Sequence, residues 1–182
     1  MNSAMDAAVF ALKEKIKQDI PKLDVIDEWP RPDQQLNLPS FSIISMGRQE
    51  IAPRIPVNYK NEDIENENLK VKAYYTLGEY NINLQGDLWT EYKKQRSYYY
   101  ELIQDVLDGD IHDGTGLNLV MKNYYNQIAQ FYLTDYAFDD SSEMATKGEW
   151  RTRFTIMLNF ERIKLATENK IVETTIREVI EV

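Results

Sequence analysis

Apolar residues recur at helical spacing along the first twenty positions of the chain. They are Met5, Ala8, Val9, Leu12, Ile16 and Ile20. Polar residues occupy most of the other positions, as in an amphipathic helix. Pro21 follows, and its ring disfavours helical geometry at the residue before it. The pattern therefore predicts a helix that ends near residue 20.

A second amphipathic helix is predicted in the middle of the chain. Residues 79–107 begin as an alternating strand, and Gly86 and Asp87 are expected to turn the chain into the helix. Asp87 or Thr90 is the expected N-terminal cap, and Gly109 is expected to close the helix. The buried stripe is predicted to comprise Leu88, Tyr92, Tyr99, Leu102, Ile103 and Val106.

Alternating apolar and polar positions predict strands in the rest of the chain. Residues 41–45 form a short apolar run, 128–138 are rich in β-forming residues, and 150–160 alternate strictly. Within 71–84 the apolar positions change from odd to even at Gly78, which predicts a bulge or bend there. The order helix, strands, helix, strands predicts an α+β fold. Its sheet is mostly antiparallel, and two main helices pack on one face.

The length of 182 residues is that of a single domain, residues 1–182. Residues 46–70 differ from the rest, because Gly47, Pro53 and Pro56 are followed by the acidic, amide-rich NEDIENEN. We interpret this stretch as an extended loop or a two-stranded arm within the domain. An ordinary surface loop is the alternative.

Composition narrows the function classes. The formal net charge of −9 gives an acidic surface that repels phosphate, so ordinary nucleic-acid binding is disfavoured. The absence of cysteine excludes disulfides and thiolate metal sites. No apolar run approaches the roughly 18 residues of a membrane span, and the N-terminus lacks the features of a signal peptide. We therefore expect no membrane association.

The chain offers no convincing catalytic or metal-binding motif. The best metal candidate is DGDIHDG at 108–114, but an EF-hand loop that begins at Asp108 would need a glycine at Asp113 and a glutamate at Leu119. His112 is the single histidine, so a catalytic triad or a two-histidine metal site has no partners. We therefore predict no enzymatic activity, no cofactor and no metal.

The twelve tyrosines favour a binding role. Those at 74–75, 98–100 and 124–125 are adjacent in sequence, so each cluster is expected to place a ring outside the core. Exposed tyrosines suit protein interfaces and also stack on sugars. The candidate interface to other subunits or to another protein comprises Arg48, Glu50, Arg54, Tyr59, Tyr74, Tyr98, Tyr100, Arg151 and Arg153. A tyrosine-rich module that binds sugar or peptide is the alternative of another class.

The layout resembles the tail-terminator, or tail-completion, proteins of long-tailed phages. The resemblance is carried in order by the N-terminal helix with its proline stop, by YNINLQGDLW followed by TEYKKQRSYYYELIQDVL, by YYNQIAQFYLTDYAF, and by EWRTRFTIMLNFERI. These are patterns of residue classes that together cover most of the chain. Residues 46–70 and the C-terminal KIVETTIREVIEV are not matched.

The resemblance implies a non-enzymatic subunit of the virion tail, assembled in the host cytoplasm. Copies form a ring, usually a hexamer, that caps the tail-tube protein, stops tube polymerisation and offers an interface to a neck or head-completion protein. DNA would pass the lumen without specific binding, in keeping with the acidic charge. Another neck, head–tail joining or tube protein of a phage or contractile injection machine is the closest alternative.

Overall fold

The computed structural model of the 182-residue chain describes residues 3–26, 30, 36–63, 70–109, 116–140 and 150–169. For 48–63, 70–74 and 166–169 it describes the backbone alone. The C-terminal segment KIVETTIREVIEV lies outside the described residues.

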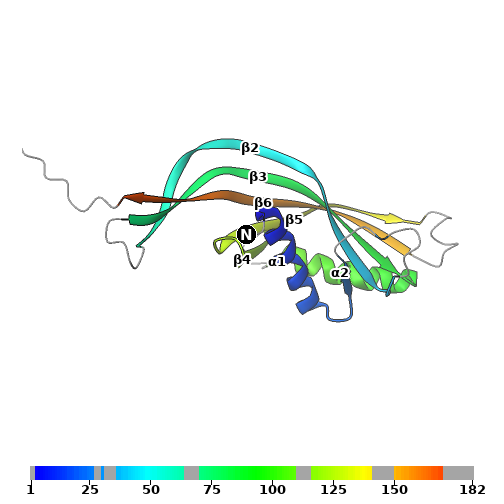
Figure 1. The fold of residues 1–182 in the computed structure, drawn as a ribbon. Helices are drawn as coiled ribbons and strands as arrows, with labels where there is room; N and C mark the ends of the chain where they lie inside the picture. The colour runs from blue at the N-terminus through cyan, green and yellow to red at the C-terminus, as the bar shows by residue number, and fades with distance from the viewer. Residues whose placement is uncertain are drawn as a thin grey trace, which may run out of the picture.

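The described residues form two helices and six strands. In chain order these are α1 (Ala4–Asp19), β1 (Asp24–Ile26), β2 (Ser40–Asp63), β3 (Lys70–Thr90), α2 (Lys93–Asp108), β4 (Leu117–Met121), β5 (Gln127–Asp139) and β6 (Trp150–Asn169). The strands form one sheet in the order β1-β2-β3-β6-β5-β4, and only the β1–β2 pair is parallel. The sheet curls, and both helices lie against the same side of it (Figure 1). The predicted α+β fold is confirmed.

The core lies between the helices and one face of the sheet. Even-numbered residues from Tyr80 to Leu88 of β3 and from Thr152 to Phe160 of β6 point into it, with Leu84 opposite Ile156 and Ile82 opposite Leu158. The helices contribute buried side chains to the same core, namely Ala8, Leu12, Ile16, Tyr99, Ile103 and Leu107. The alternation predicted for 150–160 is confirmed from Phe154 to Phe160, because period-2 patterning reports which face of a strand is buried.

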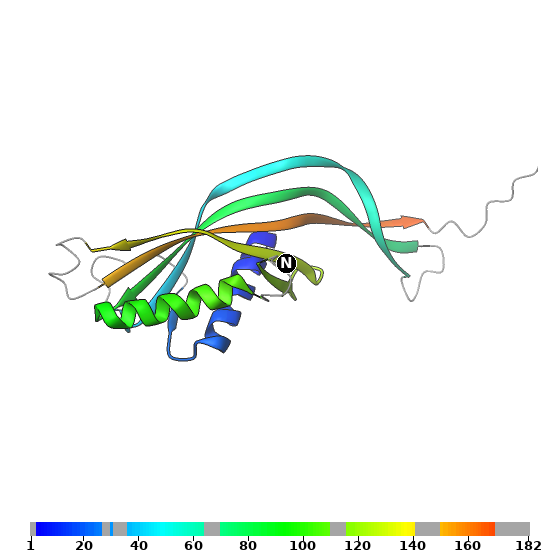
Figure 2. The same cartoon turned by 180° about the vertical axis from the view of Figure 1, so that it is seen from behind.

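Three strands continue well beyond the helices. We call this three-stranded region the arm and define it as residues 52–63 of β2, 70–79 of β3 and 161–169 of β6. It overlaps the stretch 46–70, for which the sequence predicts a loop or a two-stranded arm. Its strands stay paired to the end, with register shifts in β2 between Pro53 and Val57 and between Asn58 and Lys60, yet neither helix lies beneath their far ends (Figures 1 and 2). Pairing between β3 and β6 shifts by one residue between Thr76 and Gly78, so the predicted bulge at Gly78 is confirmed.

The expected start of the second helix is wrong. Gly86, Asp87 and Thr90 lie within β3, which stays paired with β6 as far as Thr90 opposite Trp150. Helix α2 begins at Lys93, and its capping residue Tyr92 forms no side-chain capping bond and is exposed. The apolar residues Tyr99, Ile103 and Val106 are buried as predicted, and Gly109 ends the helix in the left-handed region with φ 64°.

Candidate functional site

The predicted interface residues are divided among one flank of the sheet, the helix α2 and the inner strand β6. Arg48, Glu50, Arg54 and Tyr59 lie on β2, and Tyr74 lies on the adjacent strand β3. β1 pairs with β2 only at residues 40–42. From residue 43 to residue 63, no other strand of the described chain covers the outer edge of β2. This flank therefore carries a long open strand edge.

The second flank consists of β5 and the helix α2 beside it. β4 pairs with β5 only as far as Phe131, so residues 132–139 have β6 as their single strand neighbour among the described elements. Tyr136 and Phe138 on this edge are each 45% exposed. Tyr98 on α2 is also exposed and stacks edge-on against Tyr99. An apolar, aromatic surface thus accompanies the open edge of β5.

Tyr100 is the centre of an aromatic cluster that joins α2 to β5 and β6. Its ring centroid lies 4.7 Å from that of Tyr136, 5.4 Å from that of Phe138 and 5.8 Å from that of Phe154. Burial, together with the hydrogen bond to Tyr136, raises the pKa of Tyr100 to about 12. Tyr100 therefore holds the helix against the exposed part of β5.

The Tyr100→Phe variant is expected to remove from the alkaline titration a phenol whose pKa is about 12. In the native protein the folded state binds the Tyr100 proton more tightly than the unfolded chain, whose tyrosines titrate near pH 10. The stabilisation is complete below about pH 10 and is lost as the pH rises toward 12. Absorbance at 295 nm measures the titration of the phenols, and urea unfolding at pH 9 and 11 measures the loss of stability. An unchanged alkaline titration curve in Tyr100→Phe would contradict this assignment.

The two predicted arginines of β6 have different environments. Arg153 is exposed, whereas Arg151 is buried and its Nε lies 2.6 Å from Oδ1 of the fully buried Asp87. Nη1 of Arg151 also lies 3.9 Å from a carboxylate oxygen of Asp139 at the end of β5. Its guanidinium carbon lies 5.1 Å from the Trp89 ring. Arg151 therefore links β3, β5 and β6 from inside the protein.

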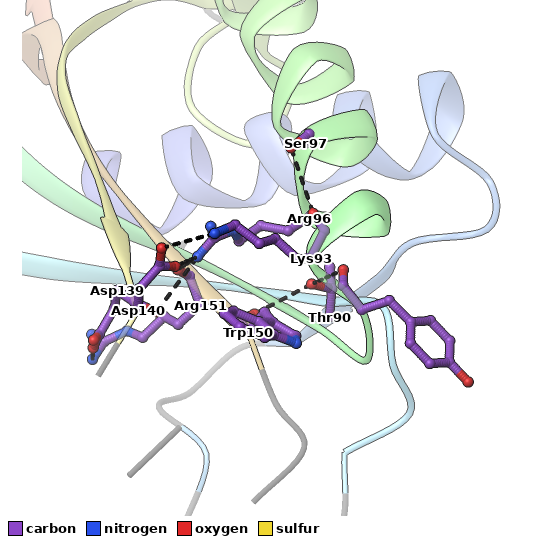
Figure 3. Close-up of polar contacts among 9 residues, drawn as sticks. Thr90, Lys93, Arg96, Ser97, Asp139, Asp140, Trp150 and Arg151 are labelled. Carbon is purple, nitrogen blue, oxygen red and sulfur yellow. Dashed lines mark hydrogen bonds and ion pairs between the residues drawn. The ribbon is translucent and has the colours of Figure 1, made fainter. Parts of the chain in front are cut away.

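A second arginine, Arg96 of α2, lies beside Arg151, and the two arginines with their carboxylate partners form a charged cluster (Figure 3). It is 3% exposed, and its Nη1 lies 2.5 Å from Oδ1 of Asp140, which Lys93 approaches at 3.3 Å. The hydrogen bond from Arg96 is the main cause that lowers the pKa of Asp140. The guanidinium of Arg96 also lies over the rings of Phe138 and Trp150, at 4.6 and 5.4 Å.

This cluster has the arrangement of structural ion pairs. Each of its carboxylates contacts an arginine or a lysine, and the pairs connect the start of α2 to the ends of β5 and β6 (Figure 3). Sequence reasoning missed Arg96 and Asp140 and assigned Asp87 to a helix cap. The sequence contains one signal of this cluster. Asp87 and Arg151 are charged residues within segments that otherwise alternate as strands do.

A groove lies between α1 and β4, with a volume of about 620 Å³. Its walls include Phe10 and Val120, which are 52% and 50% exposed. Three lysines and one glutamate lie among its lining residues, which are Ala7, Phe10, Ala11, Glu14, Lys15, Lys17, Gln18, Leu119, Val120, Lys122 and Asn123. The groove was not foreseen from the sequence.

The described residues contain no group of three or more histidine, aspartate or glutamate side chains placed to hold a metal ion. Residues 110–114 of the segment 108–114, His112 among them, lie outside that part of the chain. No described helix combines the length and the apolar character needed to cross a bilayer. The sequence matches no protein-family model, and no curated protein matches it significantly.

Proposed function

We propose that this chain is a structural subunit whose copies form a ring on the end of a phage tail tube, ending tube polymerisation and providing the interface to the neck or head. The observation that carries the proposal is the arm. Its paired strands extend beyond the helices that cover the rest of the sheet (Figure 1). A sheet of three strands needs a buried apolar face to be stable in water. A neighbouring subunit or the tube would supply the missing layer.

The open edges of β2 and β5 support a head-to-tail contact between copies. They lie on opposite flanks of one sheet, so the β5 edge of one copy can meet the β2 edge of the next. Such a heterologous contact closes into a ring when the rotation between copies is suitable. β2 and β5 run in opposite directions, so the junction would continue the antiparallel pairing around the ring. The ring would also protect edges that otherwise invite uncontrolled strand addition.

The cationic part of the β2 edge complements the charge of the β5 edge. Residues 43–60 of β2 contain Arg48, Arg54 and Lys60 against the acid Glu50, and the acids Glu62 and Asp63 follow at the end of the strand. Residues 132–139 of β5 contain Asp135 and Asp139 and no cationic residue. Opposite charges on facing surfaces steer association and set its register. The net charge of −9 in turn suits a lumen that DNA crosses without being held.

Light scattering after size-exclusion chromatography, with and without purified tail tubes, tests the proposal. We expect rings, hexameric as in the family that the chain resembles, either alone or on tube ends in negative-stain images. Tubes grown with the protein present should be shorter and capped. A protein that stays monomeric with tubes and leaves tube length unchanged is not a terminator. Incorporation along the tube, or binding to a neck ring alone, would favour the related tube or neck role.

Asp135→Lys is expected to weaken assembly at least tenfold without lowering stability. The residue is exposed on the open edge of β5, where a lysine replaces the attractive charge and disfavours strand pairing. Glu14→Lys is the matched control, because it makes the same charge change at an exposed position of α1, outside this flank. Sedimentation velocity measures assembly and thermal melting measures stability. Equal effects of the two variants would contradict a junction at β5.

A further inference from the structure

We propose that the groove between α1 and β4 binds an extended, acidic segment of a partner protein, which adds to the sheet as a strand beside β4. This site is separate from the open edges of β2 and β5. The inference does not depend on ring formation, so it is tested on the isolated protein.

β4 is suited to accept another strand. It is the outermost strand of the sheet and pairs only with β5 on its inner side, as far as the described elements show. All five of its residues, Leu117–Met121, carry a backbone N–H, because the strand contains no proline. Five residues span about 16 Å, so a segment of about five residues would match the edge. Strand addition provides affinity through main-chain hydrogen bonds, and adjacent pockets provide specificity.

The groove beside this edge provides an apolar pocket. Ala7 and Ala11 present only methyl groups on the α1 side, which leaves space between the helix and the strand. The half-exposed Phe10 and Val120 flank that space. The volume of about 620 Å³ lies within the range of ligand-binding clefts. An apolar side chain of the incoming segment would therefore bury surface that is now in contact with water.

Charge identifies the chemistry of the segment. Lys15, Lys17 and Lys122 line the groove against Glu14 alone, although the chain as a whole has a net charge of −9. Lys15 pairs with Asp19 at 2.8 Å, and Lys17 lies 4.0 Å from Glu14. Both pairs are at least partly open to solvent, and such pairs contribute little to stability, so the lysines remain available to other carboxylates. The groove is a cationic site on an acidic protein, and acidic segments are its complement.

The probe is a fluorescein-labelled, acetylated octapeptide in which glutamate alternates with valine. Fluorescence anisotropy should show that it binds at least ten times more tightly than the same peptide with lysine for glutamate. Its affinity should fall as salt rises, because the lysines are solvent-exposed. Two further peptides are methylated at the backbone nitrogens, one at its odd-numbered residues and one at its even-numbered residues. One of the two should bind at least ten times more weakly, because only every second residue of the added strand donates its N–H to β4. Equal affinity for the acidic and basic peptides, or unchanged affinity in both methylated peptides, would overturn the proposal.

Two variants locate the binding. Ala11→Phe should abolish it by filling the groove, and the double variant Lys15→Glu, Lys122→Glu should weaken it at least tenfold even if Ala11→Phe fails to fold. Lys94→Glu on α2 is the control, since it is exposed and lies outside the groove. Binding that survives the double variant refutes the site. Self-association of the isolated protein in sedimentation velocity that is lost in the double variant would show that a second copy occupies the groove and would overturn the partner assignment.

Discussion

Replacement of Arg151 by methionine is expected to lower the free energy of unfolding by about 3–5 kcal/mol, the usual cost of removing one partner of a buried ion pair. Asp87 is fully buried, and the Nε of Arg151 lies 2.6 Å from its carboxylate. Without the guanidinium, that carboxylate stays in the interior without its ion-pair partner. Guanidinium chloride unfolding, followed by tryptophan fluorescence, measures the loss.

Arg153→Met is the matched control for this prediction. It makes the same substitution two residues further along β6, but at an exposed position, where a change of less than about 0.5 kcal/mol is typical. The double variant Asp87→Leu, Arg151→Met should recover much of the stability, because it leaves no buried charge unpaired. A loss in Arg151→Met no larger than that in Arg153→Met would show that the pair does not stabilise the fold.

Features with a local physical cause were predictable from the sequence. Pro21 marks the end of α1, since Ile20 is its capping residue and leaves helical geometry. The apolar positions change from odd to even at Gly78, where the pairing of β3 with β6 shifts by one residue. This shift keeps the apolar residues before and after it on the same face of the sheet. The α+β class followed from the order of the elements, without knowledge of any contact.

The error at residues 86–90 arose from contacts that are distant in sequence. Glycine followed by aspartate is ordinarily a turn signal. Here Asp87 is held by Arg151, which lies 64 positions further along the chain. Arg96 was missed for the same reason, because its partner Asp140 is 44 residues away. Residue-type patterns along the chain do not report such pairings.

The structure shows where the candidate interface residues lie, and their role stays a prediction. Tyr100 lies against the open edge of β5, Tyr98 is on the same helix, and the residues chosen from 46–70 lie on the open edge of β2. Arg151, expected at an interface, is buried. The groove at α1 had one available signal, namely that Phe10 falls outside the apolar stripe of its helix and is therefore exposed. Its position beside β4 depends on tertiary packing.

Gly86→Val is expected to destabilise the protein by about 3 kcal/mol, near the upper end of the usual cost of overpacking a core. A Cβ atom at this position would lie 2.5 Å from Cζ of Phe41. The Phe41 ring is fully buried and packs edge-on against Phe154, with 5.7 Å between the ring centroids, so it has little room to move away. Gly86 therefore serves close packing between β2 and β3.

A second substitution separates this steric effect from the conformational preferences of the backbone. Valine is favoured over glycine in strands, so propensity alone predicts that Gly86→Val stabilises β3. Shortening the ring side chain in the double variant Gly86→Val, Phe41→Leu should make room for the valine. The double variant should then be less destabilised than the sum of the two single variants, by at least about 1 kcal/mol in a double-mutant cycle. Simple additivity in urea unfolding would mean that the Phe41 ring is not the obstacle. On the expected result, position 86 requires glycine because the Phe41 ring on the neighbouring strand occupies the space that a side chain would fill. Gly86 then serves packing within the sheet and does not mark a turn.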